Sequence, residues 1–190
     1  MSKIDNYSVI GVMSGTSLDG LDIIKCTFQK GDDWSFKIEK GITNKYSKNW
    51  LELLKNSYKK NPKELQKNDY LYGDYIGKQV KIFIKKNNFK VDLIASHGHT
   101  IFHQPENKIT LQIGNGQNIA NITNTTTISD FRSLDVKLNG QGAPLVPIGD
   151  LKLFQSYKYC LNLGGFANIT NTTTISDFRS LDVKLNGQGA

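Results

Sequence analysis

Cysteine is scarce in this chain of 190 residues, and long apolar runs are missing. The longest apolar runs fall far short of the roughly 18 residues that a membrane-spanning helix needs, so we expect no membrane span. Met1–Asp5 carries no apolar signal-peptide core. The two cysteines, Cys26 and Cys160, are too few for a disulfide framework and lie in apolar, strand-like contexts. We therefore expect a cytoplasmic protein in which both thiols are free and buried.

Arginine is the scarcest charged residue type. Of the 24 basic residues, only Arg132 and its duplicate Arg179 are arginine, and lysine fills every other basic position. A planar guanidinium binds a carboxylate or phosphate through two parallel hydrogen bonds, which an ammonium cannot do. The pattern therefore favours an anionic ligand at Arg132. The alternative is a structural ion pair with Asp130 or Asp135.

The formal net charge of +7 raises the possibility of a nucleic-acid partner. However, twelve lysines fall between Lys45 and Lys90, on two segments with the periodicity of amphipathic helices. Solvated helix faces explain these lysines, and no aromatic–basic RNA-binding motif is present. We expect no nucleic-acid partner and rank a lysine-rich nucleic-acid module as the weakest functional hypothesis.

A 24-residue segment occurs twice without a single change. Ala120–Ala143 recurs as Ala167–Ala190, 47 positions later. Natural repeats diverge, and solenoids need about three or more units to bury their faces. We interpret the second copy as a recent duplication or a sequence-assembly artefact, and not as a second functional site.

The order of the expected elements indicates an α/β fold with a mixed sheet. Strands are expected at 7–13, 21–29, 34–43, 91–96, 111–113, 126–130 and 157–163. Helices are expected after the N-cap Ser47 and at 62–86, 117–123 and 145–154. The clearest helix start is Asn61-Pro62-Lys63-Glu64, which supplies a cap, a proline at the first helical position and a glutamate at the third.

The segment Ile10–Ile23 carries the strongest functional signal. Between two strand-like runs it places Ser14–Ser17 (Ser-Gly-Thr-Ser) and Asp19–Gly20, which predict a tight turn. Gly15 and Gly20 can take a positive φ and let the backbone approach a ligand. Free backbone N–H groups in such a turn suit phosphate oxygens. An ordinary hairpin turn is the alternative.

Three histidines cluster at positions 97, 99 and 103. No cysteine or carboxylate pattern supports a zinc site there, so we expect no protein-bound metal. A strand that ends in Ser-His-Gly places polar side chains at the carboxyl edge of a sheet, where α/β folds bind ligands. Glycine-rich loops follow at 112–116 and 138–144. Together with the turn and Arg132, they favour a phosphate- and sugar-binding site.

Six segments carry a closer resemblance. They are VMSGTSLDGLD (Val12–Asp22), SHGHTIFHQP (Ser96–Pro105), LQIGNGQNIA (Leu111–Ala120), SDFRSLDV (Ser129–Val136), NGQGAPLVP (Asn139–Pro147) and LNLGGFANIT (Leu161–Thr170). In this order they resemble the anhydro-N-acetylmuramic acid kinase family over nearly the whole chain before the duplication. The resemblance implies an actin/hexokinase-like (ribonuclease H-like) lobe. It also implies a kinase that uses ATP and Mg²⁺ to convert 1,6-anhydro-N-acetylmuramic acid to N-acetylmuramate 6-phosphate, with hydrolytic ring opening, in cell-wall recycling.

The resemblance assigns roles to individual positions. The ATP phosphate loop comprises Ser14, Gly15, Thr16, Ser17, Leu18, Asp19, Gly20 and Leu21. The sugar-binding residues are His97, Gly98, His99, Asp130, Arg132 and Gln141. Gly164, Gly165 and Asn168 belong to a loop of a second lobe. The implied partner is a small amino sugar, and neither nucleic acid nor a membrane is expected as a partner. The resemblance leaves open whether the full-length kinase forms a homodimer.

The chain departs from the family pattern in places. Ser133 stands where a second basic residue is expected, His99 where glutamine is expected and Asn139 where glycine is expected. After Thr170 the family continues into a Phe-Asp-x-Gly-Pro-Gly-like segment whose aspartate is the general base, and this sequence lacks it. The catalytic residue is therefore unassigned, and we expect the chain as written to be inactive. The alternative function is a catalytically silent nucleotide- or sugar-binding fragment.

These departures suggest a division of the chain into three parts. We expect a first lobe over 1–155 and the start of a second, largely missing lobe over 156–170. The tail over 171–190 copies 124–143 and is expected to be poorly ordered. A strand formed by the tail would have no position of its own in the first sheet, so it is expected to pack poorly or to pair at a sheet edge.

Overall fold

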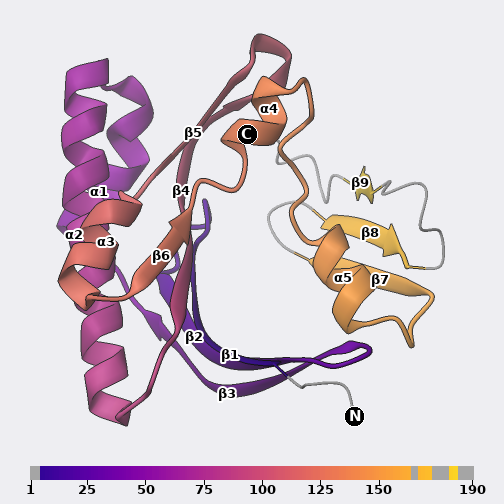
Figure 1. Cartoon of the computed structure of the whole chain (residues 1–190). Coiled ribbons are helices and arrows are strands. Elements are labelled where there is room, and N and C mark those ends of the chain that lie inside the picture. The colour runs from indigo at the N-terminus through magenta and orange to yellow at the C-terminus, as the bar shows by residue number, and fades with distance from the viewer. Residues whose placement is uncertain (1–4, 164–166, 173–179, 184–190) are drawn as a thin grey trace.

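The computed structural model describes residues 5–163, 167–172 and 180–183, which form two sheets of different size (Figure 1). The larger sheet contains β1 (Asp5–Ser14), β2 (Leu21–Lys30), β3 (Trp34–Asn44), β4 (Leu93–Gln104), β5 (Ile109–Ile113) and β6 (Thr126–Ser129). The smaller sheet contains β7 (Tyr159–Leu163), β8 (Ala167–Asn171) and β9 (Ser180–Val183). The helices are α1 (Lys48–Asn56), α2 (Pro62–Asn87), α3 (Gly116–Thr123), α4 (Ser133–Lys137) and α5 (Pro147–Leu153), with short 3₁₀ turns η1 (Ser57–Lys59) and η2 (Pro105–Asn107).

The larger sheet is mixed. Strands β1, β2 and β3 form an antiparallel meander, and β4 joins β1 in the parallel direction. The other edge of β4 is shared, because its first half pairs parallel with β6 and its second half pairs antiparallel with β5. This topology confirms the predicted α/β class with a mixed sheet and is consistent with an actin/hexokinase-like lobe.

The change of partner along β4 falls at Gly98. Its φ is +72°, and a Cβ at this position would lie 2.6 Å from the carbonyl oxygen of Ile113. Only glycine tolerates both the positive φ and this close approach of another backbone. Gly98 therefore allows β4 to pass from β6 to β5 and ends the regular pairing beside His97.

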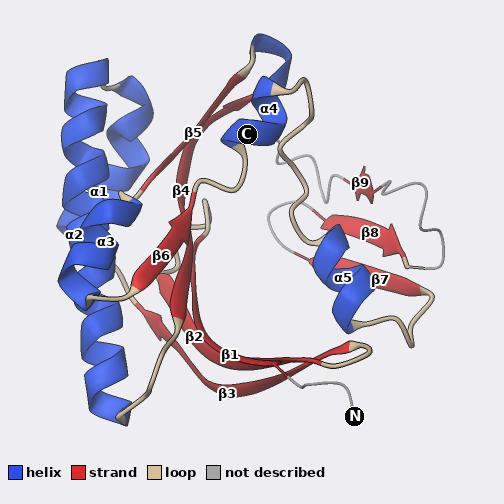
Figure 2. Cartoon of the chain, viewed as in Figure 1, coloured by secondary structure: helices blue, strands red, loops and turns tan. Residues whose placement is uncertain are grey.

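Helices α1, α2 and α3 cover one face of the larger sheet (Figure 2). The capping box of Asn61 and Glu64 begins α2, as predicted. Its buried face includes Tyr72, Ile76 and Val80, which pack against the sheet in a core where none of the three is exposed. This burial of apolar surface is the main stabilising contribution of the helix layer.

Two glycines on α2 allow α3 to pack closely against α2. A Cβ at Gly73 would lie 2.7 Å from the carbonyl oxygen of Asn115, and one at Gly77 would lie 3.1 Å from Cβ of Ile122. The side chain of Asn115 caps α3 by accepting a hydrogen bond from the backbone N–H of Asn118. The start of α3 is therefore fixed against α2 and beside the end of β5.

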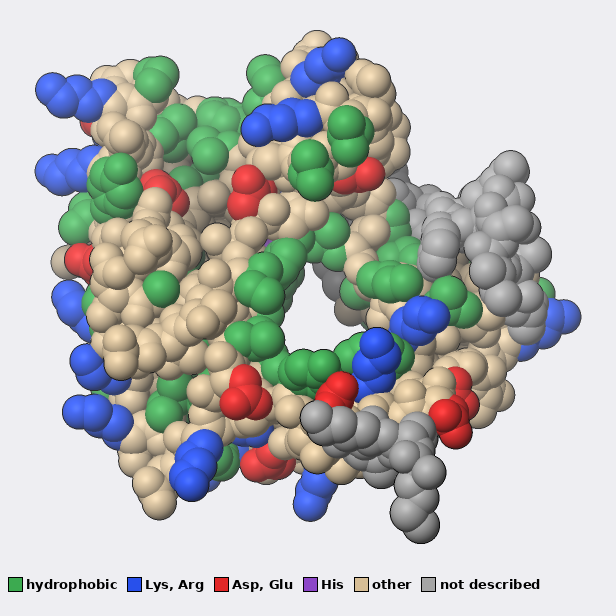
Figure 3. Space-filling view, in the orientation of Figure 1, with side chains coloured by type: hydrophobic (Ala, Val, Ile, Leu, Met, Phe, Trp, Pro, Cys, Tyr) green, Lys and Arg blue, Asp and Glu red, His purple; other side chains and the backbone are tan. Residues whose placement is uncertain are grey.

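No helix layer formed by the described residues covers the opposite face of the larger sheet (Figure 2). The strand register places Met13, Ile38 and Ile128 on this face, and all three are exposed. A hollow bordered by hydrophobic side chains lies beside it (Figure 3). At one end, the ring of Phe36 on β3 packs edge-on against Phe154, which follows α5, with 5.6 Å between the ring centroids.

Most of the predicted elements are present, with three differences. β4 runs through the histidine segment to Gln104 and does not end at Ser96, because β5 continues its pairing. Helix α4 was not predicted, and neither were β8 and β9 of the smaller sheet. Strand β9, in the duplicated tail, pairs with β8 at the edge of that sheet, whereas 173–179 and 184–190 lie outside the described residues.

Candidate functional site

The predicted phosphate loop connects two paired strands. Ser14 pairs with Leu21, so the loop closes an antiparallel hairpin, as expected. Thr16, Ser17 and Asp19 are exposed, and their backbone N–H groups donate no hydrogen bond to any described residue. The loop therefore presents unpaired N–H donors and two hydroxyl groups, which is the donor set that suits phosphate oxygens.

The role expected for the loop glycines was wrong in one respect. Neither Gly15 nor Gly20 has a positive φ, and Leu18 takes the left-handed conformation with a φ of 60°. The N–H of Leu18 donates to the carbonyl oxygen of Gly15 at 3.1 Å, which closes the turn. Gly20 is needed for space instead, since a Cβ there would lie 2.7 Å from the carbonyl oxygen of Asn44.

Ser14, the first residue of the predicted loop, is buried in a chain of hydrogen bonds under the helices. Its Oγ lies 2.8 Å from Oη of Tyr46 and 3.0 Å from Nδ1 of His99, and Tyr46 Oη lies 2.6 Å from Oη of Tyr72. Burial raises the pKa of both tyrosines and lowers the pKa of His99 to about 4. The chain is therefore uncharged at neutral pH and fixes the base of the loop to β4.

A polar pocket lies where β4, β5, α3 and the end of β6 meet. Its volume is about 250 Å³. The residues that line it are Asp69, His97, Gly98, Thr110, Leu111, Gln112, Gly114, Asn115, Gly116, Ser129, Asp130 and Ser133. Three of the predicted sugar-binding residues, His97, Gly98 and Asp130, are thus brought together in one pocket.

Arg132 holds His97 at this pocket. The Nε and Nη2 atoms of Arg132 lie 3.0 and 2.9 Å from Nε2 of His97, and Nη1 donates to the carbonyl oxygen of Gly142 at 2.6 Å. The other ring nitrogen, Nδ1, lies 3.0 Å from the carbonyl oxygen of Gly98. Since a carbonyl only accepts, Nδ1 carries the proton and Nε2 accepts from Arg132. Burial lowers the pKa of His97, which matches this neutral form.

The guanidinium of Arg132 has no carboxylate partner among the described residues. The two ion pairs found there join Lys25 to Glu39 and Lys60 to Glu64. The expected alternative, a structural pair with Asp130 or Asp135, is therefore wrong. Those carboxylates accept backbone N–H groups instead, from Ser133 at 3.1 Å and from Gly142 at 2.6 Å. Arg132 is a partly buried cation whose charge is unpaired within the described chain.

Two other predicted sugar-binding residues, His99 and Gln141, lie apart from the pocket. His99 points under the helices toward Ser14, and Gln141 is exposed. Asn168, predicted for the second-lobe loop, lies on β8 of the smaller sheet, where its Oδ1 is buried and has no hydrogen-bond partner among the described residues. Gly164 and Gly165 lie outside the described residues.

Sequence reasoning missed several residues of the pocket wall. Asp69 accepts hydrogen bonds from the N–H of Gly114 at 2.8 Å and from the side chain of Asn115 at 2.9 Å. Its partners are about 45 positions away in the chain, so no local pattern marks it. Gln112 and Thr110 lie on β5 within or beside a noted glycine-rich loop, and only the sheet register places them at the pocket.

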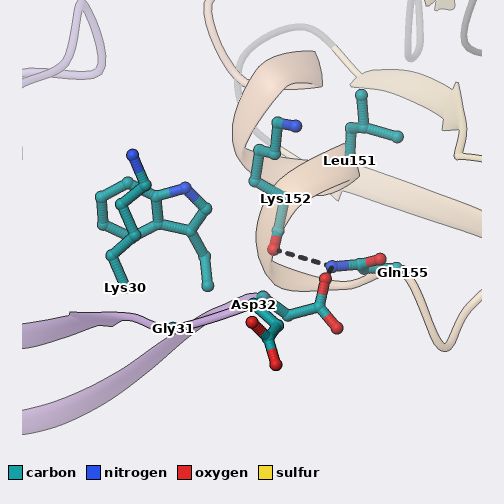
Figure 4. Close-up of a pocket in the computed structure, with 8 residues that line it drawn as sticks. Lys30, Gly31, Asp32, Leu151, Lys152 and Gln155 are labelled. Atoms are coloured by element: carbon teal, nitrogen blue, oxygen red, sulfur yellow. Dashed lines mark hydrogen bonds between the residues drawn. The ribbon is translucent and has the colours of Figure 1, made fainter. Parts of the chain in front are cut away.

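A larger hollow lies elsewhere. It has a volume of about 400 Å³ between the β2–β3 turn and α5, and its lining includes Lys30, Asp32, Leu151 and Lys152 (Figure 4). The side chain of Gln155 bridges it by donating to Asp33. None of the predicted site residues lines this hollow, so the polar pocket beside His97 is the candidate site.

Two searches of the described residues bear on metals and membranes. No group of three or more His, Cys, Asp or Glu side chains in that part of the chain could hold a metal ion. None of its helices is long and apolar enough to cross a membrane.

The mixed sheet and its helix layer are consistent with the class of actin/hexokinase-like lobes. The family model for anhydro-N-acetylmuramic acid kinase matches residues 7–172, and the chain belongs to this family of kinases. Anhydro-N-acetylmuramic acid kinase of Pseudoalteromonas translucida (strain TAC 125) is 37% identical over 83% of this chain and 44% of its own length. The enzyme of the same name from Bacillus cereus (strain ATCC 10987 / NRS 248) is 39% identical over 83% of this chain and 45% of its own length. The chain thus spans less than half the length of these relatives.

Proposed function

We propose that this chain is the sugar- and phosphate-binding lobe of an ATP-dependent kinase. Its substrate is 1,6-anhydro-N-acetylmuramic acid, and its product is N-acetylmuramate 6-phosphate, formed with hydrolytic ring opening. The names of the relatives support this substrate. The proposal includes a cytoplasmic role in cell-wall recycling, with a small amino sugar as the partner.

The observation that carries the proposal is the charge of Arg132, which lies beside the polar pocket and has no carboxylate partner among the described residues. Muramic acid carries a lactyl carboxylate, which would supply the missing negative charge. A partly desolvated guanidinium binds such a group more strongly than a solvated one, because the low local dielectric strengthens the attraction. The pocket also offers Asp130 and the hydrogen-bonding groups around His97, which suit sugar hydroxyl groups.

The loop after β1 fits the triphosphate of ATP. Thr16, Ser17 and Asp19 supply the unpaired backbone N–H groups, and the loop is open to solvent. Mg²⁺ is usually held by one or two carboxylates together with substrate phosphates, so a dedicated cage of protein ligands is not required. Asp19 is the loop carboxylate that would hold it. ATP and Mg²⁺ together would supply the phosphoryl group and neutralise its charge during transfer.

Residues 1–190 alone are proposed to bind the sugar without turning it over. A general base contributes about 10²–10⁴-fold to the rate of such reactions, and no residue of the pocket is assigned to that role. This is the catalytically silent fragment of the alternative hypothesis, which the coverage of 44% and 45% of the relatives favours.

The test measures binding and turnover separately on the purified chain of 190 residues. Calorimetric titration with 1,6-anhydro-N-acetylmuramic acid is expected to show binding that weakens about tenfold or more in Arg132→Lys, because the bidentate fork is lost. Arg179→Lys is the matched control, since it makes the same change in the same local sequence. Absence of sugar binding would contradict the proposed function. ADP release that depends on both ATP and the sugar would contradict the proposed catalytic inactivity of this chain but not its proposed specificity for the sugar.

A further inference from the structure

One wall of the polar pocket includes Thr110 and Gln112 of β5. Gln112 lies next to Gly98, since a Cβ at position 98 would be 3.4 Å from Cβ of Gln112. Because Gly98 and His97 both line the pocket, Gln112 is adjacent to the proposed sugar-binding residues. Its side chain is the longest neutral polar group in the wall.

A hydrogen-bond relay fixes the orientation of the Gln112 carboxamide. Its Nε2 donates to Oγ1 of Thr110 at 2.9 Å, and this Oγ1 lies 3.2 Å from Nδ1 of His103. Burial and the charge of Arg132 lower the pKa of His103, so its Nδ1 can accept a proton donor at neutral pH. Thr110 has a single hydroxyl proton. When that proton is donated to His103, Thr110 can only accept from Gln112, and the carboxamide must direct its NH₂ group toward Thr110.

The relay leaves the carboxamide oxygen of Gln112 unused. This Oε1 is buried and has no hydrogen-bond partner among the described residues. A buried acceptor without a donor is unfavourable and calls for an explanation, such as a ligand that the site is built to receive.

We propose that Gln112 is a specificity-determining residue, whose Oε1 accepts a hydrogen bond from the acetamido N–H of the sugar. This inference rests on the proposed function and names the group of the substrate that the pocket recognises. A sugar hydroxyl can donate or accept and would tolerate either orientation of the carboxamide. An amide N–H can only donate, so an acceptor held in one orientation discriminates in its favour.

The test compares two ligands that differ at one atom. The purified chain of 190 residues is titrated with 1,6-anhydro-N-acetylmuramic acid and with its 2-O-acetyl analogue, in which an ester oxygen replaces the amide N–H. The wild-type chain is expected to bind the amide about tenfold or more tightly than the ester. Gln112→Met keeps the length of the side chain without its acceptor, and this preference should disappear. Gln117→Met, on exposed α3 surface, is the matched control and should keep it.

A second variant tests the relay itself. Thr110→Val removes the hydroxyl group at nearly constant volume, so the carboxamide is free to turn and the preference for the amide should fall about threefold or more. An unchanged preference in Gln112→Met overturns the inference while leaving the proposed function intact. If the wild-type chain binds neither sugar, the proposed function fails and the inference fails with it. Amide nitrogen and proton resonances of the chain confirm that each variant is folded.

Discussion

The two copies of the 24-residue repeat have identical sequences and different structures. Ala120–Asn124 lies at the end of helix α3, whereas the same five residues at Ala167–Asn171 form strand β8. Likewise, Ser133–Val136 lies in helix α4, and its copy Ser180–Val183 is strand β9. The local sequence therefore does not determine the structure of these residues. Their surroundings do.

The signals that make the α3 part of the first copy helical lie outside the repeat. The cap residue Asn115 and the first turn of α3 precede Ala120, so they were not duplicated. The glycines of α2 that receive α3 also occur once. Isoleucine, threonine and asparagine are weak helix formers, and β-branched residues favour strands. The second copy lacks the cap and follows β7, with which β8 pairs, so the strand preference prevails.

The largest effect is expected when acid lowers the stability of the larger sheet, on which the helical part of the first copy packs. Burial lowers the pKa of His99 to about 4, against about 6.5 in the unfolded chain. As pH falls from 7 toward 4, the unfolded chain takes up a proton that the folded chain does not. The contribution of His99 to the free energy of unfolding is fully present above pH 6.5 and is lost as pH falls. The loss amounts to about 3 kcal/mol once pH reaches the pKa of the folded state.

Urea unfolding between pH 4 and pH 7 measures this loss. His99→Gln removes the titrating group and should flatten the dependence by about the same amount. The amide protons of α3 and of the larger sheet should both exchange faster with solvent at acidic pH than their neutral-state protection predicts. If the variant retains the full pH dependence, His99 is not its source.

A smaller effect is expected from separating the two helices that make the first copy helical. In Gly73→Ala, the new methyl group would lie 2.7 Å from the carbonyl oxygen of Asn115, so α3 must move. We expect a loss of about 2 kcal/mol in the free energy of unfolding. Gly149→Ala on α5 is the control, because nothing lies within 4 Å of that position. A loss of equal size in both variants would argue against close packing of α2 on α3.

Removal of the cap should cost less. In Asn115→Ala, α3 loses the acceptor for the N–H of Asn118, and we expect a loss of about 1 kcal/mol. Asn115→Ser retains a capping oxygen and should recover part of it. Circular dichroism and urea unfolding measure both variants. Equal stability of the two variants would show that the contact of Asn115 with Asp69, and not the cap, is what matters.

Patterns that act over a few residues were the predictable part of this protein. The first three strands and the capped start of α2 follow from local turns, caps and periodicity, and they are confirmed. The burial of Ser14, the pairing of Arg132 with His97 and the position of Gln112 depend on residues brought together by the sheet. The ion pair of Lys25 could not be predicted from local sequence either, since its buried side chain pairs with Glu39 on the neighbouring strand. No spacing in the sequence encodes such contacts.

The smallest expected effect comes from one substitution made once in each copy. Ile122 packs on Gly77 in the helical copy, and Ile169 pairs with Leu161 in the strand copy. Ile→Val removes one methylene group at either position. In α3 the lost contact and the lower helix propensity of valine act together, so Ile122→Val should cost about 1 kcal/mol. In β8 the high strand propensity of valine offsets the lost contact, so Ile169→Val should change stability by less than about 0.5 kcal/mol. Urea unfolding of the two variants measures the difference directly. Because the neighbouring sequence is identical at both sites, equal losses would mean that the two copies have the same structure in solution.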